Sequence, residues 1–104
     1  MDGFPDHRRK ELVHELGAYA YAIRSAIEKA PPREELEVLK VLESSAVQAL
    51  RVLGQIPATA TLLDDLRAFV HRESPAVEAL CSGGVATRVG QAFRRFAGVV
   101  DEPA

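Results

Sequence analysis

The sequence predicts an all-α helical bundle, and three observations lead to this fold class. Apolar residues recur at helical spacing along most of the chain, Pro and Gly punctuate these stretches, and no stretch alternates in the way typical of strands. The chain has 104 residues, 47% of them hydrophobic, which suits one helical domain spanning 1–104. We expect a long antiparallel helix hairpin, at about 6–29 and 33–53, followed by three shorter helices.

The first helix is expected over about residues 6–29. Proline and acidic side chains suit a first turn, and Pro5 precedes Asp6 here. The helix must end before the proline pair at 31–32, because a residue that precedes proline is pushed out of the α region. At 100° per residue, a stripe about 120° wide forms the expected core face. It contains Leu12, Leu16, Tyr19, Ala20, Ile23, Ala26 and Ile27.

The second helix, at about 33–53, is apolar on two faces. Its main stripe is rich in leucine, whereas Val38, Val41 and Val52 lie outside that stripe. A helix of this kind either is buried among more than two neighbours or lies in an oligomer interface. Gly54 and Pro57 are expected to end it.

Three shorter helices are expected in the rest of the chain. The first runs from a cap at 59–61 to about 73, and Ser74 followed by Pro75 predicts the start of a second at about 75–82. A glycine pair at 83–84 separates these from the last helix, at about 85–98. Arginines lie on the outer side of that helix, where they either bind an acidic partner or a phosphate or form a solvated face. They are Arg88, Arg94 and Arg95.

Composition excludes several classes of function. The net charge of −2 gives no reason to expect a nucleic acid as a partner, and no apolar run approaches the roughly 20 residues that span a bilayer. One cysteine, Cys81, precludes an internal disulfide, and the charged start does not resemble a signal peptide, so we expect a cytoplasmic protein with no membrane partner. No phosphate loop, nucleophile elbow or metal-ligand cluster is present, so no cofactor and no metal are expected.

The face of the first helix opposite its core stripe carries the main functional candidate, His14. A neutral imidazole is nucleophilic at neutral pH and can accept a phosphoryl group, while a neighbouring carboxylate, Glu15 or Glu11, can hold its tautomer and accept a proton. Small residues one turn away, Gly17 and Ala18, leave room for the active site of another protein. Tyr21 adds an aromatic side chain of the kind enriched at interfaces. The alternative is that His14 is an ordinary surface residue.

A resemblance to a known family favours the functional interpretation. The segment His14-Glu15-Leu16, followed by Ile23-Arg24-Ser25-Ala26-Ile27-Glu28, resembles the H-box of sensor histidine kinases. The H-box lies in the first helix of the dimerisation and histidine-phosphotransfer domain of that family. The likeness covers about residues 8–55. It implies a helix hairpin that dimerises into a four-helix bundle, with His14 as the phospho-acceptor and Glu15 as its acidic neighbour.

The chain also departs from the family pattern. After His-Glu-Leu the family has Arg or Lys, then Asn or Thr, then Pro, whereas this chain has Gly17, Ala18 and Tyr19. The missing polar residue at Ala18 puts phosphatase-type chemistry in doubt, and the missing proline removes a helix bend. No ATP-binding domain follows, so the chain is not expected to act as an autonomous kinase.

The sequence therefore predicts a phosphotransfer-like or docking module of two-component signalling. The expected partner is the receiver domain of a response regulator, and the expected assembly is a homodimer through the first two helices. A non-catalytic adaptor, which binds a protein through the Tyr21 face or the arginines of the last helix, is the alternative from another class. A small DNA-binding regulator is a third possibility, against which the net charge of −2 argues.

Overall fold

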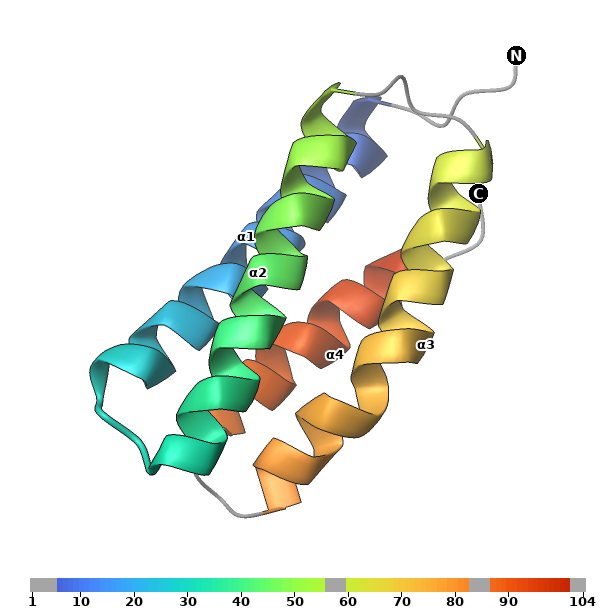
Figure 1. The fold of residues 1–104 in the computed structure, drawn as a ribbon. Helices are drawn as coiled ribbons and strands as arrows, with labels where there is room; N and C mark the ends of the chain where they lie inside the picture. Colours follow the sequence, from blue (N-terminus) through green and yellow to red (C-terminus); the bar gives the residue numbers. More distant parts are fainter. Residues whose placement is uncertain (1–5, 56–59, 83–86, 102–104) are drawn as a thin grey trace.

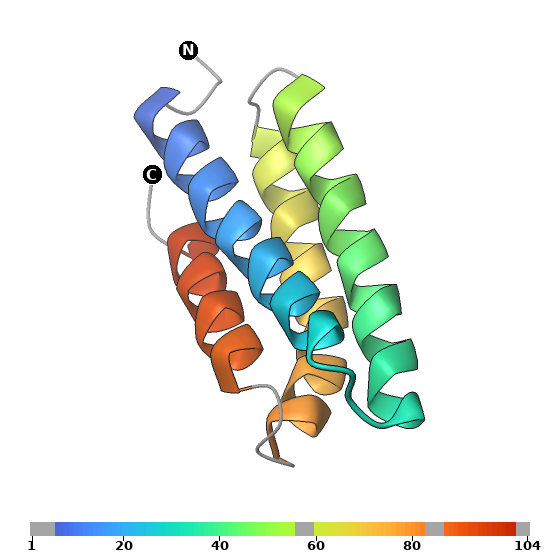
Figure 2. The same cartoon turned by 90° about the vertical axis from the view of Figure 1, so that its left-hand side faces the viewer.

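The structure, a computed structural model, describes residues 6–55, 60–82 and 87–101. It is all-α, as the sequence predicts, and the described residues contain no strand. Successive helices run antiparallel in a bundle (Figure 1). They are α1 (Asp6–Glu28), α2 (Arg33–Gln55), α3 (Ala60–Ser82) and α4 (Thr87–Asp101). α1 packs against both α2 and α4, between which it lies in Figure 2.

The core face predicted for α1 is the one that the structure buries. Leu12, Leu16, Tyr19 and Ile23 have no exposed surface. The helix ends because Ala30 adopts a left-handed backbone with a φ of 55°, and a proline pair follows it. The amide of Ala30 donates a hydrogen bond to the carbonyl of Ile27 at 3.1 Å, which satisfies one of the free carbonyls of the last turn.

Within the described residues the hairpin is followed by two helices, so the expectation of three shorter ones is wrong in this respect. The expected break before Pro75 does not occur, and α3 continues through this proline to Ser82. Pro75 cannot donate to the carbonyl of His71, but both residues are exposed, so water can satisfy that carbonyl. Val77 and Leu80 are buried beyond the proline, and their packing holds the helix together.

The helix ends also differ from expectation. α2 runs through Gly54 to Gln55, whereas the expected stop at Pro57 lies outside the described residues. α4 ends at Asp101, three residues later than predicted, because Val99 and Val100 are buried in the bundle. The expected start of this helix at 85 also lies outside the described residues.

Two arginines of α1 donate hydrogen bonds to backbone carbonyls near the C-terminal ends of α4 and α2. Arg8 is only 5% exposed, and its Nη2 donates hydrogen bonds to the carbonyls of Val99 at 3.1 Å and Val100 at 3.4 Å. Arg9 donates from Nε and Nη2 to the carbonyl of Leu53, at 3.1 and 2.8 Å. The last carbonyls of a helix lack partners within the helix and carry partial negative charge, so a guanidinium suits them.

Helices α3 and α4 of the same chain cover the apolar face of the α1–α2 hairpin. Tyr19 packs against Phe93 with ring centroids 5.2 Å apart, and Phe69 meets Phe96 edge-on at 6.1 Å. In the family that the sequence resembles, a second hairpin from a partner subunit covers this face. The four-helix bundle is here completed within one chain, so a homodimer needs a different surface.

Candidate functional site

The outer face of α1 brings together most of the residues predicted as a site. His14, Ala18 and Tyr21 are exposed, and Tyr21 is the most exposed large hydrophobic side chain of the described residues, at 75%. A Cβ atom added at Gly17 would meet nothing within 4 Å, so the surface beside His14 is open. Glu15 lies half-buried at the edge of this face. We call His14, Gly17, Ala18 and Tyr21 the histidine face.

Charged residues of both signs surround the histidine face. Lys10 and Glu11 are exposed one turn before His14, at helical positions that neighbour it. One turn beyond Tyr21, Arg24 forms ion pairs with Glu28 at 4.0 Å and with Glu43 of α2 at 3.5 Å. A histidine with a carboxylate and an ammonium group within one turn is suited to meeting a phosphoryl group.

The predicted arginine cluster of α4 is divided between two sides of the helix. Arg88, Arg94 and Arg95 are all exposed. Arg88 and Arg95 are seven residues apart and share one side. Arg94 lies on the other side, where it lines a small pocket of ≈ 110 Å³ between α3 and α4. The structure thus does not gather the three arginines into one patch.

That small pocket is bordered by the one cysteine of the chain. Cys81 is half-buried near the end of α3, and a Cβ atom added at Gly90 of α4 would overlap its Sγ. The glycine therefore allows the two helices to approach closely at this level. This arrangement accounts for Gly90 as a packing residue.

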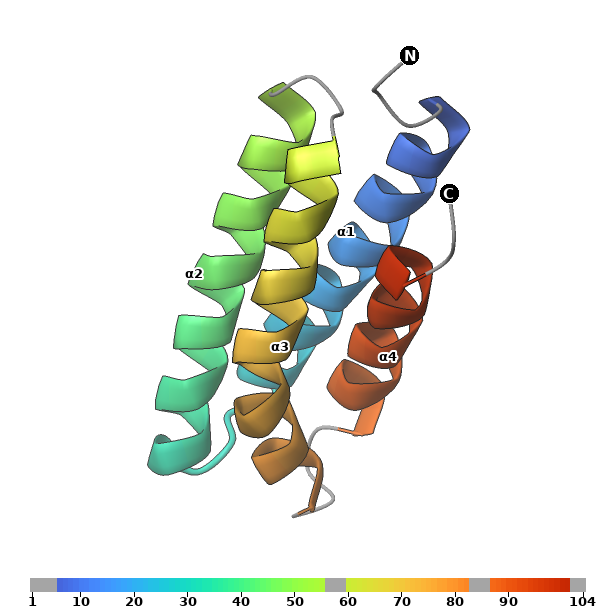
Figure 3. The ribbon, with the colours of Figure 1, turned by 90° about the vertical axis from the view of Figure 1, so that its right-hand side faces the viewer.

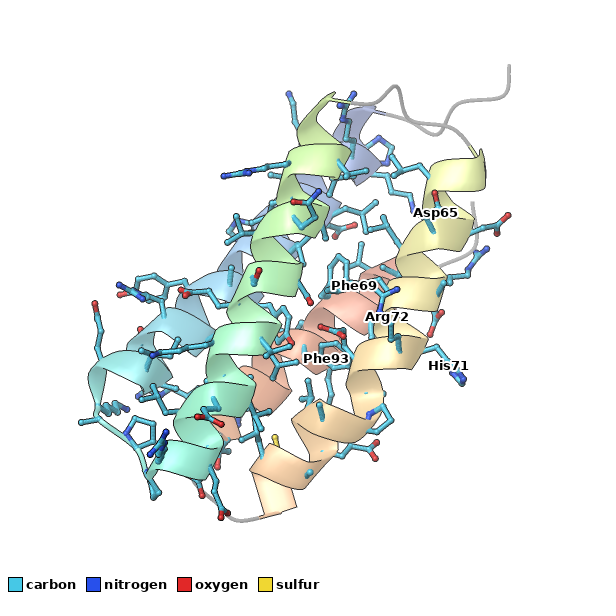
Figure 4. All side chains as sticks on the ribbon, in the orientation of Figure 1. Asp65, Phe69, His71, Arg72 and Phe93 are labelled. Carbon is cyan, nitrogen blue, oxygen red and sulfur yellow. The ribbon has the colours of Figure 1, made fainter. Side chains whose placement is uncertain are left out.

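A larger groove of ≈ 560 Å³ lies between α2 and α3, and sequence reasoning missed it. The two helices contact each other sparsely. Figure 3 shows them side by side, on the opposite side of the bundle from α1 and α4. The groove is lined by Ser44, Ser45, Gln48, Ala49, Val52, Asp65, Leu66, Ala68, Phe69 and Arg72. Figure 4 shows Asp65 and Arg72 along α3, with His71 pointing away from the bundle. The guanidinium of Arg72 lies 5.8 Å from the ring centroid of Phe69.

Two buried polar side chains, Tyr19 and Glu73, interact electrostatically inside the bundle. Glu73 is 8% exposed, and within the described residues no hydrogen-bonding partner reaches its Oε1 or the hydroxyl of Tyr19. Burial, followed by the charges of Glu73 and Cys81, raises the pKa of Tyr19 well above its ordinary value of 10.0. The burial of Glu73 could have been predicted from the sequence, because Glu73 continues the inward stripe of Leu66 and Phe69 at helical spacing.

The fold and the histidine face define an antiparallel four-helix bundle with an exposed imidazole on one outer helix. No described helix is long and apolar enough to cross a membrane. Among the described residues no group of three or more His, Cys, Asp or Glu side chains is placed to hold a metal ion. No protein-family model, no curated protein and no solved structure matches the chain.

Proposed function

We propose that this bundle is a phosphotransfer module of two-component signalling, in which His14 exchanges a phosphoryl group with the aspartate of a receiver domain. The observation that supports it is the placement of His14 on the histidine face. The imidazole is exposed in the middle of a 23-residue helix, beside the open surface at Gly17. The buried core does not use this face, so a partner can approach without disturbing the fold.

The proposed reaction needs only the imidazole and the phosphorylated partner. The lone pair of one ring nitrogen of His14 attacks the phosphorus atom of the aspartyl phosphate. A nitrogen–phosphorus bond forms as the phosphorus–oxygen bond to the aspartate breaks, and the aspartate leaves as a carboxylate. The other ring nitrogen keeps its proton, and the positive charge on the ring is stabilised by the nearby carboxylates of Glu11 and Glu15.

Docking would use the rest of the histidine face. Gly17 and Ala18 add almost no bulk beside His14, so the active-site loops of a receiver can come close. Tyr21 lies two turns from His14 on the same strip of the helix, and its exposed ring offers apolar area with a polar tip. Tyr21 is therefore the proposed anchor of the complex, and His14 is the proposed reacting residue.

Phosphotransfer from a panel of ³²P-labelled receiver domains of the host tests the proposal. We expect acid-labile label on the wild type and none on His14→Gln. His7→Gln is the matched control, because His7 is also exposed and lies two turns earlier on the same strip. Circular dichroism checks that both variants stay folded. Label that persists in His14→Gln, or no label from any receiver, contradicts the proposal.

A second candidate function is a non-catalytic adaptor that docks on the same partner. The observation that favours it is the 75% exposure of Tyr21, an uncommon degree for a tyrosine on a helix. In this case binding of an unphosphorylated receiver survives His14→Ala and is lost in Tyr21→Ala. Isothermal titration calorimetry with both variants separates the adaptor from the phosphotransfer module.

A further inference from the structure

Helix α2 carries a second stripe that the bundle leaves largely uncovered. Its residues are spaced alternately by three and four, as the core positions of a coiled coil are. They are Val38, Val41, Ser45, Gln48 and Val52, which we call the α2 seam. Val41 is 64% exposed, and Val38 is exposed as well. The α2 seam therefore has the pattern of a helix–helix contact without a helix on it.

Helix α3 does not fill this role. It touches α2 sparsely, and the groove of ≈ 560 Å³ separates the two helices along the second half of α2. Ser45, Gln48 and Val52 line that groove, and the two exposed valines extend the seam beyond it. The seam thus runs over four turns: its first half is exposed at Val38 and Val41, and its second half forms one wall of the groove, where Ser45 and Val52 are half-buried.

The α2 seam is arranged symmetrically about Ser45. Val38 and Val52 lie seven residues on either side of it, and Val41 and Gln48 lie four and three residues on either side. When two copies of such a helix run antiparallel, Val38 meets Val52 of the partner subunit and Ser45 meets its own copy. The small serine at the centre lets the two backbones approach closely.

Charges beside the seam favour the same antiparallel arrangement. Glu37 lies before the centre and Arg51 after it, both exposed and on the same flank of α2. An antiparallel pair brings Glu37 opposite Arg51 of the partner subunit, and it does so twice. A parallel pair would instead place Glu37 and Arg51 on the flank opposite their own copies, so the two residues would form no such opposite-charge pair.

We propose that two copies of this chain associate through α2, antiparallel, about a twofold axis at Ser45. Self-complementarity in both spacing and charge is the property of a homodimer interface, which uses the same patch on both subunits. The proposal does not rest on the chemistry of His14, because the histidine face of α1 takes no part in it.

Analytical ultracentrifugation of the wild type and of two glutamate variants tests the interface. We expect a concentration-dependent dimer for the wild type and a monomer for Val41→Glu. Val47→Glu is the matched control, since Val47 is an exposed valine of α2 outside the α2 seam, and we expect it to dimerise like the wild type. A wild type that stays monomeric overturns the proposal, as does a dimer unaffected by Val41→Glu.

A charge exchange tests the antiparallel direction. Glu37→Arg and Arg51→Glu each place like charges across the interface, and each is expected to weaken the dimer by at least about tenfold in Kd. An equimolar mixture of the two variants restores both opposite-charge pairs, so it is expected to form a heterodimer with an affinity near that of the wild type. A mixture no tighter than its components overturns the antiparallel pairing.

Cysteine cross-linking in a Cys81→Ala background locates the axis. Ser45→Cys is expected to form a disulfide-linked dimer under mild oxidation, because the axis brings two copies of this residue together. Val38→Cys alone is expected to stay uncross-linked, and to link only when mixed with Val52→Cys. Self-linking of Val38→Cys as efficient as that of Ser45→Cys would show a parallel pair and overturn the proposal.

Discussion

Helices α1 and α3 have the same length and differ in how completely their neighbours cover them. α1 packs against α2 on one side and α4 on the other, and two of its arginines bond the ends of both neighbours. α3 packs well only against α4 and leaves a groove towards α2. The difference teaches that stability is concentrated around α1, whereas the surface that is free for a partner lies along the α2–α3 side.

The largest expected difference in the free energy of unfolding is between truncation of a side chain on the buried face of α1 and truncation of one on the exposed α2 seam. Leu16→Ala opens a cavity in the fully buried face of α1 and is expected to lower the free energy of unfolding by about 3–5 kcal/mol. Val41→Ala, on the exposed α2 seam, is expected to change it by no more than about 0.5 kcal/mol. Urea unfolding of dilute protein measures both. Similar losses in the two variants would refute the contrast.

Removal of the Arg8 side chain is expected to have the second-largest effect on the free energy of unfolding. Arg8→Ala deletes charge-assisted hydrogen bonds to the carbonyls of Val99 and Val100 and is expected to cost about 2–3 kcal/mol. Hydrogen exchange should show the loss first in the last turn of α4. Arg94→Ala, an exposed arginine of α4, serves as control and is expected to stay within about 0.5 kcal/mol of the wild type.

The buried hydroxyl of Tyr19 gives the smallest expected effect, and one of opposite sign. Tyr19→Phe removes a buried group that lacks a hydrogen-bonding partner among the described residues, so it is expected to stabilise the bundle by about 1 kcal/mol. Chemical unfolding at neutral pH measures this gain. A loss of stability would mean that the hydroxyl makes a favourable contact in solution.

The same substitution changes the response of the bundle to alkali. The pKa of Tyr19 is raised in the folded state above the value of 10.0 that it has when unfolded. The unfolded chain therefore loses this proton first as the pH rises, and folding stability falls above pH 10. Below that pH the contribution is fully present. Unfolding curves at pH 9 and 11 should show a smaller loss for Tyr19→Phe than for the wild type.

The sequence predicts the tightly packed side of the molecule better than the open side. The core face of α1 and the end of that helix follow from the spacing of apolar residues and from the proline pair, which are local properties. The break predicted at Pro75 is wrong because Val77 and Leu80, which follow it in α3, are buried. Their burial outweighs the local tendency of a proline to end a helix. That packing depends on contacts with another helix, which a rule based on local sequence does not include.

The candidate site shows the same division. The exposure of His14, Ala18 and Tyr21 on one face follows from helical periodicity, and the structure has the same arrangement. The groove between α2 and α3 depends on the relative placement of two helices, which periodicity does not determine. The α2 seam is recognisable in part from the sequence, as a second face with valines. Its exposure, however, depends on where α3 packs, and the sequence pattern does not show that.

The bonds from Arg8 to the end of α4 also constrain the order in which the chain can fold. The residues joined by this contact are 91 and 92 positions apart, so α1 meets one of its two neighbours only after α4 has been synthesised. Until then the α1–α2 hairpin must expose the apolar face that Phe93 later covers. Closure of the longest loop is thus expected to limit the rate at which the bundle forms.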